Sequence, residues 1–106
     1  LSDSVYASAA AVLAQLTGNK KKFDETLYWA EESLKSAPEQ IYALHLRAYA
    51  HLYLDNFYQA EKDFHEVRNR LKNSKGVPKS GFDIVIPEEV VDQGLREIEQ
   101  RRAGNS

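Results

Sequence analysis

Residues 47–64 read RAYAHLYLDNFYQAEKDF and contain two amphipathic runs separated by an Asp-Asn bend. The first run carries Ala48 among larger apolar side chains, and Phe57 opens the second run. Ala60 and Phe64 follow at intervals of three and four residues, which places all three on one face of a helix. The stretch therefore predicts two helices joined by a tight turn.

An earlier part of the chain repeats this arrangement. Phe23 and Phe57 are 34 residues apart, and Ala14 and Ala48 have the same separation. Antiparallel helices approach closely where one presents a small side chain and a larger side chain of the neighbour fills the gap. The two alanines and two phenylalanines thus predict two helical hairpins with one period.

This period resembles that of the tetratricopeptide repeat (TPR) family, in which each repeat is a pair of antiparallel helices. The resemblance covers residues 6–73, and Pro38 falls where the first repeat should end. The small and aromatic positions of the family are occupied in the second copy by Ala48, Phe57, Ala60 and Phe64. The resemblance implies a short α-solenoid that binds protein segments, and a helical bundle without repeats is the alternative.

The predicted architecture is an all-α fold of about five helices, stacked as antiparallel hairpins. Alanine-rich sequence favours the first helix, which the Thr-Gly-Asn triplet at residues 17–19 is expected to end. Pro38 is expected to end the second helix. The helices are predicted at residues 4–16, 23–37, 39–54, 58–72 and 88–102.

The domain boundaries follow from these helices. Residues 1–75 form the two TPR-like hairpins, residues 76–87 an extended linker, and residues 88–103 a C-terminal capping helix. Within the linker, residues 82–86 alternate like a strand, and we expect an ordered loop packed on the hairpins. The alternative is that this segment lies in the groove of the same or a neighbouring molecule. The chain opens on Leu1 and contains no Met, so we expect a fragment of a longer protein or a processed form.

The composition limits the possible functions. Of the 106 residues, 42% are hydrophobic and 28% are charged, which is typical of a globular domain. The net charge of -2 gives no general attraction to nucleic acid, so no nucleic-acid partner is expected. The chain has no cysteine, which excludes disulfides and thiolate metal sites and leaves the compartment undetermined. No apolar run is long enough for membrane insertion, and we favour a soluble, cytoplasmic protein.

The sequence contains little that predicts catalysis. His45 and His51 are six residues apart, on different helix faces, and no HExxH pattern is present. There is no nucleophile elbow and no Gly-rich phosphate loop. We therefore expect no enzyme activity, no metal and no cofactor.

A partner-binding groove is the main functional hypothesis. In the TPR resemblance, the first helix of each repeat lines a concave groove that holds a peptide or a partner helix. Tyrosine suits such a groove because it offers a broad rigid face and a hydroxyl at little entropic cost. The alternative is that some of the tyrosines pack against neighbouring helices. The predicted groove residues are Val12 and Gln15 in the first copy, and Tyr42, His45, Leu46, Tyr49, Leu52 and Tyr53 in the second.

Two function classes therefore remain open. The first is an adaptor or scaffold domain that binds a protein or peptide partner. The second is a self-association module that joins identical chains through the repeat edge or through residues 82–86. Some TPR domains clamp a carboxylate with Lys, Asn and Arg, but the matching positions here hold Ala11, Gln15 and Leu46. We therefore expect the groove to accept an apolar or aromatic segment.

Overall fold

The computed structural model describes residues 3–74 and 86–105. Over these residues the chain forms five α-helices and no strand. They are α1 (Asp3–Asn19), α2 (Phe23–Ser36), α3 (Ile41–Tyr53), α4 (Phe57–Ser74) and α5 (Glu88–Asn105). The prediction of an all-α fold with five helices is confirmed.

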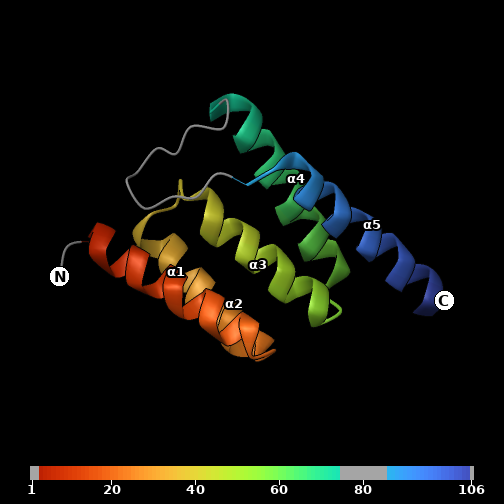
Figure 1. The fold of residues 1–106 in the computed structure, drawn as a ribbon, viewed down its shortest axis with the longest axis horizontal. Helices are drawn as coiled ribbons and strands as arrows, with labels where there is room; N and C mark the ends of the chain where they lie inside the picture. The colour runs from red at the N-terminus through yellow and green to blue at the C-terminus, as the bar shows by residue number, and fades with distance from the viewer. Residues whose placement is uncertain (1–2, 75–85, 106) are drawn as a thin grey trace.

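The helices pack in the order in which the chain makes them. Each helix contacts the next along the chain, and α3 also contacts both α1 and α5. The resulting row measures 46 × 30 × 19 Å, and α1 and α5 lie at its opposite ends (Figure 1). The central helix α3 is therefore the one element that shares surfaces with all four others.

The turns after α1 and α3 have the same backbone structure. Lys21 and Asp55, which are 34 residues apart, both adopt positive φ, 61° and 62°. The next residue in each turn donates its amide to a carbonyl five residues earlier: Lys22 to Thr17 at 2.9 Å, and Asn56 to His51 at 2.8 Å. This is the Schellman arrangement, which satisfies the last free carbonyls of a helix.

The predicted end of the first helix at residue 16 is wrong. α1 continues through Gly18 to Asn19, and the left-handed residue that ends it is Lys21. Thr17 lies within the helix, and its hydroxyl donates back to the carbonyls of Leu13 and Ala14, both at 2.9 Å. The C-terminal ends of α2, α3 and α4 lie one or two residues from the predicted ones, as expected from fraying at helix termini. α5 ends three residues later than predicted.

The core is built from small residues on one side and large ones on the other. Alanines cover the inner face of α1, and Ser33 of α2 donates to the carbonyl of Ala7 at 2.7 Å. Around α3 and α4 the side chains are larger, with Leu52, Phe64 and Val67 fully buried. The α1–α2 pair is thus stabilised by close approach of the two backbones, and the rest of the row by burial of large apolar side chains.

Gly94 allows α5 to pack against the core. A Cβ atom at this position would lie 2.5–2.9 Å from three carbons of the buried Phe64 ring. Glycine costs a helix about 1 kcal/mol relative to alanine, and here it is the residue that lets the α5 backbone reach Phe64. Arg68 of α4 also pairs with Asp92 of α5, and Arg102 pairs with Glu61 at 3.3 Å.

Most of the predicted linker, residues 76–87, lies outside the described residues. Its last two residues are described: Ile86 is buried in the core, and Pro87 precedes α5. None of the described helices is both long enough and apolar enough to span a membrane.

Candidate functional site

A groove opens where the end of α1, the start of α2 and one face of α3 meet. It encloses about 300 Å³. α1 contributes Gln15, Gly18 and Asn19, and α2 contributes Phe23 and Thr26. The central helix contributes the remaining lining residues, which are Tyr42, His45, Leu46, Tyr49, Ala50 and Tyr53.

Most of the predicted site residues come together in this groove. Those that line it are Gln15, Tyr42, His45, Leu46, Tyr49 and Tyr53. Two others do not. Leu52 is fully buried in the core and borders a separate small cavity beside Gly94, and Val12 projects to solvent from the outer face of α1.

The aromatic rings of the groove form a continuous series along α3. His45 and Tyr49 meet edge to face with their ring centroids 4.8 Å apart, and Tyr49 and Tyr53 lie nearly parallel at 6.2 Å. Phe23 of α2 stacks on Tyr53 at 4.6 Å. Such contacts stabilise the rings in one arrangement beyond the area that they bury, so the groove wall is preorganised.

The series passes from the core to the surface. His45 is 8% exposed and Tyr49 is half-buried, with its ring 5.2 Å from that of the core residue Phe64. Tyr53 at the far end is 40% exposed. The inner rings thus pack against neighbouring helices while the outer ring faces solvent. Burial raises the pKa of both Tyr42 and Tyr49, which keeps these phenols neutral.

His45 is an uncharged polar group at the floor of the groove. Burial lowers its pKa to about 4, so that the imidazole is neutral at pH 7. Its Nδ1 atom is buried and has no hydrogen-bond partner among residues 3–74 and 86–105. None of the described groove residues carries a charge at neutral pH, since the others are aliphatic, aromatic, amide, hydroxyl or glycine residues.

Charge is found beside the groove on α5. The guanidinium carbon of Arg101 lies 4.9 Å from the centroid of the Tyr53 ring. Arg101 also pairs with Glu97 at 3.2 Å and with Asp55 at 3.8 Å. An arginine over an aromatic face is attracted by the ring quadrupole, so α5 helps to hold the outer tyrosine in place.

Several groove residues were missed by the sequence analysis. Phe23 and Thr26 belong to the second helix of the first hairpin, which the register did not assign to the groove. They reach it because the Thr17 and Thr26 hydroxyls lie 3.0 Å apart and hold the start of α2 against the end of α1. The sequence signal for Phe23 was its 34-residue separation from Phe57, which indicated a repeated structural role for this residue.

A second hollow lies between the start of α3 and the end of α4. It encloses about 380 Å³ and is lined by Pro38, Glu39, Ile41, Arg70 and Asn73. Its main cation already has partners, because Arg70 donates to the Pro38 carbonyl at 2.7 Å and pairs with Glu66 at 3.0 Å. In the described part of the chain, no three His, Asp or Glu side chains are grouped so that they could hold a metal ion.

Comparisons with known proteins give no match. No family model, no curated protein and no solved structure matches the chain.

Proposed function

We propose that the chain is a TPR-like repeat domain that binds a segment of a protein partner in the groove along α3. The observation that carries this proposal is the aromatic series of His45, Tyr49 and Tyr53, which is anchored in the core and exposed at its outer end. Aromatic anchors of this kind dominate the free energy of many protein interfaces.

The internal repeat supports the TPR-like assignment. The two turns that share positive φ and the same Schellman hydrogen bonds are separated by 34 residues, as are the two phenylalanines that begin α2 and α4. The packing of each helix on the next is also the packing that a helical repeat requires.

The chemistry of the lining favours an uncharged partner segment. A charged ligand group buried in the groove would lose its hydration without gaining a counterion from the lining residues. An aliphatic or aromatic side chain would instead cover the tyrosine rings and Leu46. We therefore propose a partner peptide or helix with an apolar anchor, and we assign no catalytic step to the groove.

A selection from a displayed peptide library tests this proposal. We expect the selected peptides to be enriched in aromatic or aliphatic residues and to bind at micromolar affinity, measured by fluorescence anisotropy. Tyr53→Ala should weaken binding about tenfold or more, because it removes an exposed anchor. Tyr53 is chosen over Tyr49 because it contributes less to the core.

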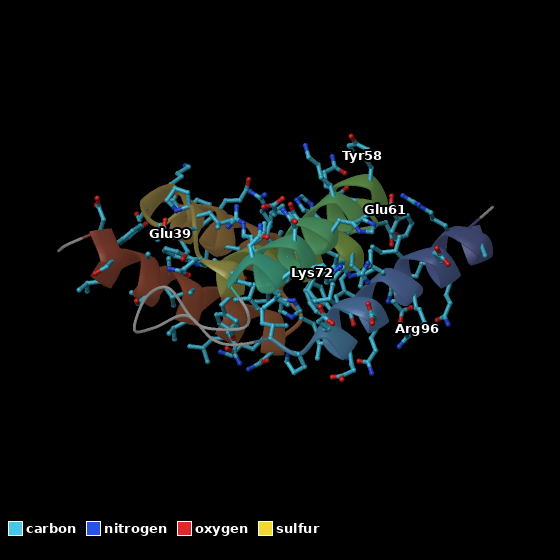
Figure 2. The ribbon with its side chains drawn as sticks, turned by 90° about the horizontal axis from the view of Figure 1, so that it is seen from above. Glu39, Tyr58, Glu61, Lys72 and Arg96 are labelled. Carbon is cyan, nitrogen blue, oxygen red and sulfur yellow. The ribbon has the colours of Figure 1, made fainter. Side chains whose placement is uncertain are left out.

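The matched control is Tyr58→Ala. Tyr58 is 69% exposed on α4, outside the groove, and projects from the body of the molecule (Figure 2). This variant should bind the selected peptides as the unmodified chain does. The proposal is wrong if Tyr53→Ala and Tyr58→Ala bind equally well, or if the selection is dominated by charged peptides.

The second candidate function is self-association, through the repeat edge or residues 82–86. Except for Ile86, the latter segment lies outside the described residues. The repeat edge is described, and the exposed face of α1 favours it.

A further inference from the structure

The first helix has its small residues inside and its larger apolar residues outside. Ala7, Ala10, Ala11 and Ala14 are buried against the neighbouring helices. On the opposite face Val5 and Leu16 are each 50% exposed and Val12 is 43% exposed. Ala9 and Leu13 are exposed on this face too. We call Val5, Ala9, Val12 and Leu16 the α1 stripe.

The spacing of the stripe is that of a helix–helix contact. Its residues follow one another at intervals of four, three and four, which keeps them in line along one side of a helix. A surface helix normally turns charged or polar side chains to water. α1 instead exposes the apolar stripe, and the polar residues beside the stripe, such as Gln15, carry no charge.

The charges of α1 lie at its two ends. Within this 17-residue helix, Asp3 is the single charged side chain, and Lys20, Lys21 and Lys22 follow its last turn. All four side chains are exposed, and none forms an ion pair with another described residue. The helix is thus negative at its start, positive just past its end and uncharged between.

We propose that the α1 stripe binds the same stripe of a second copy of this chain, with the two helices antiparallel. In this register Val5 faces the second copy's Leu16, and Ala9 faces its Val12. A larger side chain meets a smaller one in each pair, as close packing of helices requires. The contact is isologous, so a two-fold axis closes it at a dimer.

Charge complementarity selects the antiparallel arrangement. Asp3 lies opposite the second copy's Gly18, at the end of α1 that Lys20, Lys21 and Lys22 follow. The attraction occurs twice, once at each end of the contact. A parallel pair would instead place Asp3 beside Asp3 and the three lysines beside their equivalents, which is repulsive at both ends.

This inference sharpens the second candidate function, self-association, and does not depend on peptide binding in the groove. The stripe faces away from the buried side of α1, and none of its four residues lines the groove. The two proposals can fail separately. A chain that dimerises but binds no peptide would contradict only the groove proposal, and a chain that binds peptide as a monomer would contradict only the dimer proposal.

Sedimentation of the chain over a range of concentrations is the first test. We expect a monomer–dimer equilibrium with a dissociation constant of about 10 μM or tighter. The double change Val12→Glu and Leu16→Glu should weaken association about 100-fold or more, because it places like charges in an apolar contact. Both positions are exposed, so the variant should keep its helix content by circular dichroism.

The matched control for this test is Tyr58→Glu, which adds charge to an exposed aromatic position on α4. It should dimerise as the unmodified chain does. A chain that stays monomeric at high concentration overturns the proposal, and so does a dimer that survives the double change. A dimer that Tyr58→Glu disrupts equally overturns it as well, since the contact is then elsewhere.

Disulfide trapping tests the orientation, and the chain is suited to it because it has no cysteine of its own. Antiparallel pairing brings position 5 of one copy beside position 16 of the other, within the 4.4–6.8 Å or so between Cα atoms that a disulfide spans. A mixture of Val5→Cys and Leu16→Cys chains should therefore cross-link to heterodimers. Each variant alone should not, because equivalent positions are about 16 Å apart along the helices. Cross-linking of each variant to itself would show parallel pairing and overturn the proposal.

Discussion

The two helices at the ends of the row cover the molecule in opposite ways. α5 turns charged residues to solvent, with Arg96 projecting from its outer side (Figure 2) and Glu88, Glu89, Glu99 and Arg102 also exposed. α1 turns the apolar α1 stripe to solvent and has no charge between its first residue and its end. One end of the row thus exposes mainly charged side chains, while the other exposes a line of apolar ones.

The two ends are also attached by different means. α5 is held through the contact of Gly94 with Phe64 and through ion pairs to α4. α1 is held through buried alanines and the hydrogen bond from Ser33 to Ala7. Changes that act on Phe64 should therefore affect the α5 end, and changes to the outer face of α1 should leave the fold intact.

Acid should lower the stability of the fold more than any substitution below, through His45 of the central helix α3, which lines the groove and also approaches the core. The His45 ring lies 6.1 Å from that of Phe64, on which α5 packs. Its pKa is lowered from 6.5 to about 4 by burial. The unfolded chain therefore binds this proton more tightly, and the free energy of unfolding should be constant above pH 6.5 and fall by about 3 kcal/mol from there to pH 4.

Urea unfolding from pH 7 to pH 4 measures this effect, with His45→Gln as the comparison. Burial lowers the pKa of His51 as well, and carboxylates titrate at the acid end of the range. These groups are common to both chains, so the difference in slope reports His45 alone. Equal slopes would mean that the imidazole is not buried in the neutral form.

Two glycines give a comparison of the ends by the same chemical change. Gly94→Ala should destabilise the fold by about 1–3 kcal/mol, because the added methyl group meets the fully buried Phe64 ring. Gly18→Ala on α1 should be neutral or stabilising by up to about 1 kcal/mol, since its Cβ atom would meet Thr26 at an ordinary 3.5 Å.

Thermal unfolding of the two variants measures this difference, and Gly104→Ala serves as a control within α5. A Cβ atom at Gly104 would meet nothing within 4 Å. If Gly94→Ala were as harmless as Gly104→Ala, α5 would not depend on close approach to Phe64, and the contrast between the ends would fail.

The sequence predicted the helices well because their signals are local. Phe23 and Phe57 at one period, and Pro38 between them, were enough to place two hairpins. The end of α1 was predicted wrongly because glycine is the usual left-handed residue, whereas here Lys21 takes that conformation. The sequence did contain a signal for the position of this turn. The Asp55-Asn56 bend lies 34 residues after Lys21-Lys22, so the repeat period relates the two turns.

Only some of the residues that line the groove were predicted, and the reason is physical. α3 is apolar nearly all round, so its sequence does not show where the core face ends and the groove face begins. Leu52 and Tyr53 are neighbours, yet the first is buried in the core and the second lies at the edge of the groove. The positions of α4 and α5 make that division, and they depend on contacts such as that between Gly94 and Phe64, which no pattern within α3 encodes.

The smallest expected effect on the stability of the fold is at the α1 stripe. It is also the most direct test of the difference between the α1 and α5 ends. Leu16→Gln at high dilution should change the free energy of unfolding by less than about 0.5 kcal/mol, because the side chain is half exposed in the single chain. At high concentration the unmodified chain should gain stability by mass action when it dimerises, and the variant should gain less. Unfolding measured at two concentrations thus distinguishes a stripe that binds from one that is only exposed. A loss of stability that is the same at both concentrations would place Leu16 in the packing of the monomer and would remove the difference between the two ends.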